Sequence, residues 1–215
     1  MDESYDIWTF TDASISMNRC FGFKVGVYGF VHMCTDNRTN NLFPWAAGVQ
    51  AIQRFDTNIL EQCALYLALL DIRQLSKHQS ICIITDSNMT YYRLNDAIVS
   101  YNGGSRKDWM DRNMESNAMI WNCTDLYLNL LHQGYRIDIE LCKSHVDHNQ
   151  QRVWFESCGR SVSSMYAENI SIGNTYVDYY TRNIAANGYI PTLQQYSIGQ
   201  TYLESVKAGY TRQML

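Results

Sequence analysis

Three acidic residues lie where the sequence predicts that a strand ends or a helix begins. Asp12 follows a strand-like segment at 7–11, Asp86 ends the apolar run that starts at Ile81, and Glu61 lies in the first turn of a predicted helix. If the two strands are neighbours, Asp12 and Asp86 emerge side by side, and the helix can bring Glu61 to them. Carboxylates that meet raise one another's pKa unless cations neutralise them. Hard divalent ions bind such oxygens, and Mg²⁺ fits best. The pattern therefore predicts a magnesium site.

Each acid also has an ordinary structural role open to it. Asp12 and Asp86 could be helix caps or turn residues, because Asp followed by small polar residues is common in both. Glu61 could complete a capping box with Asn58, three residues earlier. Singly, each acid is explained by capping or by a turn, so the hypothesis of a shared site depends on the conjunction of all three.

The segments that position these acids are predicted from hydrophobic spacing. Alternating apolar residues predict strands, and apolar residues three or four apart predict helices. The expected strands are 7–11, 21–34, 45–53, 78–86 and 135–144, and the expected helices are 58–75, 89–100, 118–134 and 150–170. Three strands followed by alternating helices and strands predict an α/β fold with a five-stranded mixed sheet flanked by helices. Gly134 is expected in the C′ position, just past the end of its helix.

The chain divides by composition near residue 165. The expected α/β domain covers 1–165, and 166–215 is a tyrosine-rich C-terminal extension, since seven of the sixteen tyrosines follow residue 170. Tyrosine combines a large apolar face with a polar tip, which suits packing over another surface. The extension is therefore expected to fold onto its own domain or to form an interface with a protein partner or a second copy.

The overall composition limits the class of protein. The chain has 215 residues, of which 46% are hydrophobic and 18% charged, as is typical of a globular protein. Its seven cysteines are scattered singly without a CxxC pair, which favours reduced thiols over disulfides or a zinc site. The acidic N-terminus and the lack of long apolar stretches predict neither a secretory signal nor contact with a membrane. We therefore expect an intracellular protein of the cytoplasm or nucleus. The net charge of −4 argues mildly against a grip on nucleic acid through bulk charge.

Four segments carry a more specific pattern. They read FTDAS at 10–14, DTNILEQCALYLAL at 56–69, IITDS at 83–87 and LCKSHVDHNQQRVWFE at 141–156. Together they resemble the ribonuclease H family, of the type with Asp, Glu and Asp at the active site. Their order, spacing and predicted secondary structure agree with that family over roughly residues 5 to 160. A TDAS or TDS sequence alone is weak, whereas four segments in register are fairly specific.

This resemblance implies hydrolysis of the RNA strand of an RNA–DNA hybrid by two-metal-ion catalysis. It assigns Asp12, Glu61 and Asp86 to two Mg²⁺ ions about 4 Å apart around the scissile phosphate, with Mn²⁺ as a substitute. His145, in the loop before the last helix, would help to protonate the leaving group or to release product. A surface histidine without a catalytic role is the alternative for His145.

The sequence departs from the family pattern at a fourth carboxylate, which the family places one turn into the last helix. Counting from His145 without a gap, that position holds Phe155, and the neighbouring acid is Glu156. One residue rotates a helical side chain by about 100°, so either the loop contains an extra residue or the ligand is lost. Glu156 is the favoured fourth metal ligand and catalytic acid, and Asp147 in the loop is the second candidate.

The resemblance also suggests which residues hold the hybrid. The candidate substrate contacts are Asn58, Ser87, Arg106, Lys107 and Trp109. Asn58 could contact 2′-hydroxyl groups in the wide minor groove of the hybrid. In the loop at 101–113, Arg106 and Lys107 offer two positive charges. Trp109 offers an aromatic ring that could stack on a sugar or base, although loop tryptophans are often packing anchors.

Two other functions stay open. A catalytically degenerate module with the same fold could bind nucleic acid or protein, and the Phe at 155 and the acidic net charge favour it. Another nuclease on the same fold, such as a 3′–5′ exonuclease or a junction resolvase, is the second alternative. Exonucleases of that kind usually begin with Asp-x-Glu, whereas this chain has Asp12-Ala13-Ser14.

Overall fold

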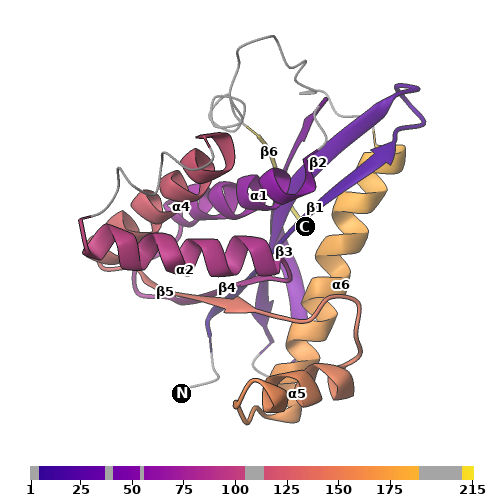
Figure 1. The fold of residues 1–215 in the computed structure, drawn as a ribbon. Helices are drawn as coiled ribbons and strands as arrows, with labels where there is room; N and C mark the ends of the chain where they lie inside the picture. The colour runs from indigo at the N-terminus through magenta and orange to yellow at the C-terminus, as the bar shows by residue number, and fades with distance from the viewer. Residues whose placement is uncertain (1–4, 37–40, 54–55, 105–113, 189–209) are drawn as a thin grey trace.

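The computed structural model describes five stretches of the chain, which form a mixed sheet with helices on both faces (Figure 1): 5–36, 41–53, 56–104, 114–188 and 210–215. The strands are β1 (Ile7–Met17), β2 (Lys24–Thr35), β3 (Leu42–Ile52), β4 (Ser80–Thr85), β5 (Arg136–Leu141) and β6 (Thr211–Met214). The helices are α1 (Thr57–Ile72), α2 (Asn88–Asn102), α4 (Met114–His132), α5 (His148–Ser157) and α6 (Ser164–Asn187).

The sheet has the strand order β5-β4-β1-β2-β3-β6. β1, β4 and β5 are parallel to one another, whereas β2, β3 and β6 are joined by antiparallel pairs. The predicted α/β fold is confirmed, and β1 and β4 are neighbours, as the hypothesis of a shared metal site requires. The sheet has six strands rather than five, because the C-terminal strand β6 pairs with β3 at the edge.

Alternating side chains of the sheet pack into hydrophobic clusters on both of its faces. Ile7 of β1 and Ile83 of β4 belong to the core shared with α1 and α4, whereas Trp8 and Phe10 belong to the core shared with α6. Successive side chains of a strand point to opposite faces, so sequence neighbours serve different cores. Figure 1 shows α1, α2 and α4 on one side of the sheet and α6 on the other.

α6 packs closely on β1 and is held at its end. Gly173 permits the approach, because a Cβ atom at this position would lie only 2.0 Å from Cζ of Phe10. The turn after β1 binds the C-terminus of the helix: Nδ2 of Asn18 donates hydrogen bonds to the carbonyls of Ile184, Ala185 and Gly188. These contacts fix the position of the helix along the strand.

Two of the differences from the predicted boundaries affect the site. β1 continues to Met17, so Asp12 lies within the strand, opposite Gly29 of β2, rather than at its end. The helical spacing at 150–170 belongs to two helices, since α5 ends before Gly159, whose φ of 78° is left-handed, and α6 begins after Ser163. The predicted position of Gly134 after α4 is confirmed, with a φ of 92°.

The C-terminal strand is tied to α1 by a buried charge network. Asp71 of α1 accepts hydrogen bonds from the Tyr210 hydroxyl and from His32 Nε2 (3.1 Å), and Nε of Arg212 lies 2.9 Å from its Oδ1. Because a carboxylate only accepts, Nε2 of His32 carries the proton and Nδ1 accepts from the Thr9 hydroxyl (2.9 Å). Burial lowers the pKa of His32; the hydrogen bonds from His32 and Tyr210 outweigh burial and lower the pKa of Asp71.

The described part of the predicted C-terminal extension contributes α6 and β6 to the sheet assembly. The boundary predicted at residue 165 falls in the first turn of α6. A protein partner or second copy bound through 166–215 stays a prediction. All seven cysteines are free thiols. Within the stretches that the structure describes, no helix combines the length and the apolar character needed to cross a membrane.

Candidate metal centre

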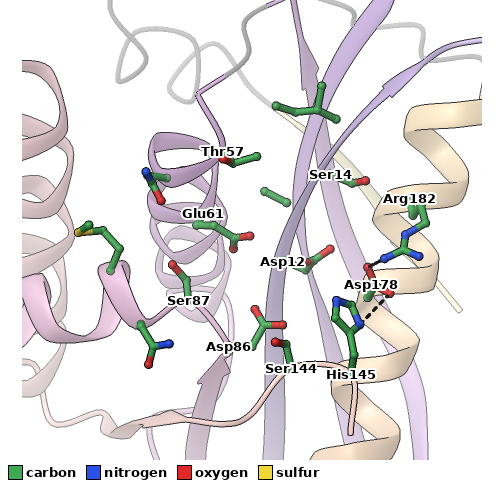
Figure 2. Close-up of a pocket in the computed structure, with 15 residues that line it drawn as sticks. Asp12, Ser14, Thr57, Glu61, Asp86, Ser87, Ser144, His145, Asp178 and Arg182 are labelled. Atoms are coloured by element: carbon green, nitrogen blue, oxygen red, sulfur yellow. Dashed lines mark hydrogen bonds and ion pairs between the residues drawn. The ribbon is translucent and has the colours of Figure 1, made fainter.

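Three carboxylates converge beside β1, as the sequence predicted. One oxygen from each of Asp12, Glu61 and Asp86 lies within 4.8 Å of the other two. Thr11 of β1 pairs with Thr85 of the parallel strand β4, so the residues that follow them lie side by side. α1 carries Glu61 near its N-terminal end and packs on β1. Figure 2 shows the three side chains pointing toward one another.

Neighbouring residues perform the capping roles that were the alternative explanation for these acids. Asp56 caps α1, since its Oδ1 accepts a hydrogen bond from the backbone N–H three residues later (3.3 Å). Ser87 caps α2 in the same way, also at 3.3 Å. Asn58 therefore does not cap α1, so Glu61 completes no capping box with it, and Asp86 is not the N-cap of α2. Asp12 lies inside β1 and caps no helix there.

Burial disfavours the ionised form of all three acids and is the largest cause for each, and nearby carboxylates add to it. It raises the pKa of Asp12 to about 7, with the charges of Asp86 and Asp178 adding to the shift and a hydrogen bond from Thr181 opposing it. Burial, followed by the charges of Asp12 and Asp86, raises the pKa of Glu61 well above its usual value. The pKa of Asp86 is also raised.

Glu61 provides a test of whether a cation fits this centre. Its Oε2 is buried and has no hydrogen-bond partner among the residues that the structure describes. A buried carboxylate oxygen without a partner costs free energy, and a hard divalent cation would both bind that oxygen and neutralise the repulsion between the acids. Three carboxylates without a sulfur ligand suit Mg²⁺ or Mn²⁺. The residues therefore fit a divalent cation.

A fourth carboxylate faces the same pocket from α6. Asp178 lines the pocket together with the three acids and His145. Its Oδ1 accepts a hydrogen bond from Nη2 of Arg182 (2.7 Å), and its Oδ2 lies 3.7 Å from Nδ1 of His145 (Figure 2). His145 follows β5, has a left-handed φ of 54° and is 63% exposed in its side chain. The predicted histidine thus lies at the pocket, beside an acid that the sequence analysis missed.

α6 also contacts both acids that come from the strands. Nδ2 of Asn174 lies 3.4 Å from Oδ2 of Asp86, and the Thr181 hydroxyl donates a hydrogen bond to Oδ2 of Asp12. Asn174, Asp178 and Thr181 are four and three residues apart, so they share one face of the helix. This spacing is visible in the sequence, but an interpretation that assigns 166–215 to an extension gives it no role.

The other predicted site residues divide into three groups. Asn58 and Ser87 line the pocket. Glu156 lies outside it, exposed on α5, where its Oε1 is 3.8 Å from Nε of Arg152. The predicted contacts that lie outside the described residues are Arg106, Lys107 and Trp109.

The structure therefore places Asp178, and not Glu156, as the fourth acid at the pocket. α5 is a short separate helix, and its N-cap is Asp147, whose Oδ1 accepts a hydrogen bond from the N–H of Gln150 (2.9 Å). Neither Asp147 nor Glu156 lines the pocket. The helix that brings the fourth acid to the pocket is α6, one helix later in the chain than α5, which carries Glu156.

Uncharged polar side chains surround the acids. Those that line the pocket are Ser14, Thr57, Asn58, Ser87, Asn88 and Ser144. The pocket has a volume of about 570 Å³, in the range of sites that hold small ligands. Such a lining can exchange hydrogen bonds with hydroxyl groups of a ligand, while the acids require a positive counter-charge.

The raised pKa of Asp12 predicts how the cation-free protein responds to pH. Between 3.8 and about 7 the folded state holds a proton on Asp12 that the unfolded state has lost, so this group lowers the free energy of unfolding as pH rises through that window. We expect Asp12→Asn to remove this loss. His32 and Asp71, with lowered pKa values, give the opposite slope, so the measured quantity is the difference in urea unfolding between wild type and variant across pH.

A bound cation should cancel the destabilisation that these buried acids cause when they are ionised. With Mg²⁺ at about 100 times its Kd, the melting temperature should rise by about 5–10 °C above pH 7, and by less at about pH 5, where the acids hold protons. Asp12→Asn should show a smaller increase. An equal increase at both pH values, or in wild type and variant alike, would contradict a cation bound at these acids.

Comparisons with known proteins give structural matches only. No model of a known protein family and no curated protein matches the sequence. The solution structure of the PFV RNase H domain matches with a TM-score of 0.50 and 13% identity, over 81% of this chain and 96% of that domain. The native crystal structure of the prototype foamy virus protease-reverse transcriptase gives a TM-score of 0.53 and 14% identity, over 83% and 21% of the two chains.

A further match is the foamy viral protease-reverse transcriptase in complex with an RNA/DNA hybrid, with a TM-score of 0.51 and 14% identity over 83% of this chain and 20% of that one. The chain thus spans about a fifth of the length of these two longer proteins. At this level of identity the matches establish the fold. The chain has a ribonuclease H-like fold.

Proposed function

We propose that this chain, which has a ribonuclease H-like fold, is an endoribonuclease that hydrolyses the RNA strand of RNA–DNA hybrids by two-metal-ion catalysis. The observation that carries the proposal is the convergence of Asp12, Glu61 and Asp86 within 4.8 Å, together with the buried, unpartnered Oε2 of Glu61. A neighbour with the same fold was solved in complex with an RNA/DNA hybrid, which supports this class of substrate.

The cation ligands of this proposal are Asp12, Glu61, Asp86 and Asp178. When bound, two Mg²⁺ ions, or Mn²⁺ in their place, lower the pKa of the attacking water and stabilise charge on the leaving 3′ oxygen. The four acids come from β1, α1, the end of β4 and α6, so they surround the pocket instead of lining one strand. A bound cation would relieve the repulsion between these carboxylates.

His145 is proposed to act on the proton of the leaving group. Imidazole ordinarily gains and loses a proton close to neutral pH, which suits proton transfer in both directions. His145 is largely exposed at the pocket, and its Nδ1 lies 3.7 Å from Oδ2 of Asp178, so the ring stands beside the acids. The ring can therefore carry a proton to the 3′ oxygen as the P–O bond breaks, and then regain one from solvent.

The selection of RNA over DNA is assigned to the uncharged polar rim. Asn58 and Ser87 line the pocket next to the acids, where they can exchange hydrogen bonds with a 2′-hydroxyl group. Hybrid duplexes present 2′-hydroxyls in a wide, shallow minor groove, which side chains can reach. Single-stranded RNA lacks that regular groove, and duplex DNA lacks the hydroxyl.

The test of the proposal is a comparison of substrates. An RNA–DNA hybrid labelled on the RNA strand, duplex DNA, duplex RNA and single-stranded RNA are incubated with the protein in Mg²⁺ or in EDTA. We expect internal cleavage of the RNA strand of the hybrid, only with the cation. Binding of the hybrid without cleavage would instead favour the degenerate binding module, and cleavage from a 3′ end of DNA would favour an exonuclease.

Two single substitutions distinguish the candidates for the fourth acid. Asp178→Asn should lower the rate of hybrid cleavage by about 100-fold, which corresponds to a loss of about 2.7 kcal/mol of transition-state stabilisation. Glu156→Gln should change the rate by less than about two-fold, because it removes only an exposed i,i+4 ion pair. Steady-state cleavage of the labelled hybrid measures both. The reverse order of effects would restore Glu156 as the fourth acid.

A further inference from the structure

Thr181 occupies an unusual position for a buried helical threonine. Its side chain is fully buried in α6, and its hydroxyl contacts Oδ2 of Asp12 on β1, 169 residues earlier in the chain. A buried threonine in a helix commonly satisfies its hydroxyl on the backbone of the preceding turn. Thr124 of α4 does this, donating to the carbonyl of Ile120 at 2.9 Å.

The hydroxyl of Thr181 has a choice of acceptors and is closest to the carboxylate. The carbonyl of Asp178 lies 3.3 Å from Oγ1, whereas the contact with Asp12 is shorter. A hydroxyl carries one proton, and a hydrogen bond to an ionised carboxylate is stronger than one to a neutral carbonyl. The proton therefore goes to Oδ2 of Asp12, which leaves Oδ1 free of this contact.

We infer that Thr181 is a positioning residue for cation binding: its hydroxyl fixes the carboxylate of Asp12 so that the remaining oxygen faces Glu61 and Asp86. The inference rests on the proposed metal-dependent function. Groups that hydrogen-bond to a metal ligand fix its orientation, and their loss typically costs 10–100-fold in metal affinity. Thr181 can act in this way because α6 is itself fixed on β1, at Gly173 against Phe10 and at its C-terminus by Asn18.

The test measures cation binding in the absence of substrate. Thr181→Val keeps the shape of the side chain and removes the hydroxyl, whereas Thr181→Ser keeps the hydroxyl. Isothermal titration with Mn²⁺ should show about 10–100-fold weaker binding for the valine variant and near wild-type binding for the serine variant. The matched control is Thr124→Val, which removes an equally buried helical hydroxyl away from the pocket and should bind Mn²⁺ as wild type does.

Thermal unfolding without cation confirms that each variant is folded, and Thr181→Ala replaces the valine variant if that variant is not. Wild-type affinity in Thr181→Val, or equal weakening in the valine and serine variants, would overturn the inference, as would weakening in Thr124→Val. If the wild-type protein binds Mn²⁺ and cleaves the hybrid while Thr181→Val matches it, only this inference fails. If the wild-type protein binds no Mn²⁺, the proposed function fails and the inference with it.

Discussion

Replacing Asp86 with Asn is expected to lower the rate of hybrid cleavage by about 10³-fold, because a loss of about 4 kcal/mol of transition-state stabilisation corresponds to that factor. Asn keeps the size of the side chain and its contact with Asn174, but it removes the negative charge shared with Asp12 and Glu61. The remaining acids would bind a divalent cation weakly and out of position. Single-turnover cleavage of a labelled hybrid in saturating Mg²⁺ measures the effect on the chemical step.

The matched control is Asp96→Asn, an exposed aspartate on α2 that does not line the pocket. Its rate should equal that of wild type. Unfolding in cation-free buffer should show Asp86→Asn to be at least as stable as wild type, because burial and neighbouring acids disfavour the charge that it removes. Substantial cleavage by a folded Asp86→Asn protein would show that this carboxylate takes no part in catalysis.

The second large effect concerns stability rather than activity. Asp71→Asn is expected to lower the free energy of unfolding by about 3 kcal/mol, the low end of the range for a broken buried ion pair, since Arg212 is partly exposed. The substitution leaves Arg212 without its carboxylate, and it weakens the hydrogen bonds that Asp71 accepts from His32 and Tyr210. Urea unfolding followed by tryptophan fluorescence measures the change.

Asp96→Asn again provides the control, because an exposed substitution should change stability by less than about 0.5 kcal/mol. The pKa of Asp71 is lower in the folded state than in the unfolded state. The wild-type protein should therefore lose the contribution of Asp71 to the free energy of unfolding as the pH falls through that lowered pKa. Asp71→Asn should therefore have a flatter acid-unfolding profile. A variant as stable as wild type would mean that the network adds specificity to the position of β6 without adding stability.

The sequence was sufficient to predict the elements around the first three acids because their signals are local. The helix predicted at 58–75 corresponds to α1, and the strand predicted at 78–86 contains β4. In both cases the apolar spacing that identifies the element lies within one stretch of chain. The convergence of Asp12, Glu61 and Asp86 then followed from placing two strands side by side, which the pairing of β1 with β4 confirms.

The fourth acid could not be located because its position depends on contacts between distant residues. Nothing local to Asp178 shows that α6 lies on β1; that packing depends on Gly173 against Phe10 and on the cap that Asn18 provides. β6 was missed for a similar reason. Its four residues have no apolar alternation, and its place at the sheet edge is supported by the contact of Arg212 with Asp71.

The docking of α6 on β1 sets a lower limit on the length of chain that can be produced as an independent unit. A protein truncated at residue 165 would retain Asp12, Glu61 and Asp86 but would leave uncovered the sheet face that presents Trp8 and Phe10. An apolar surface of that kind promotes aggregation. Expression of this α/β unit alone therefore requires at least the chain through the end of α6, and fusion partners or tags belong beyond that point.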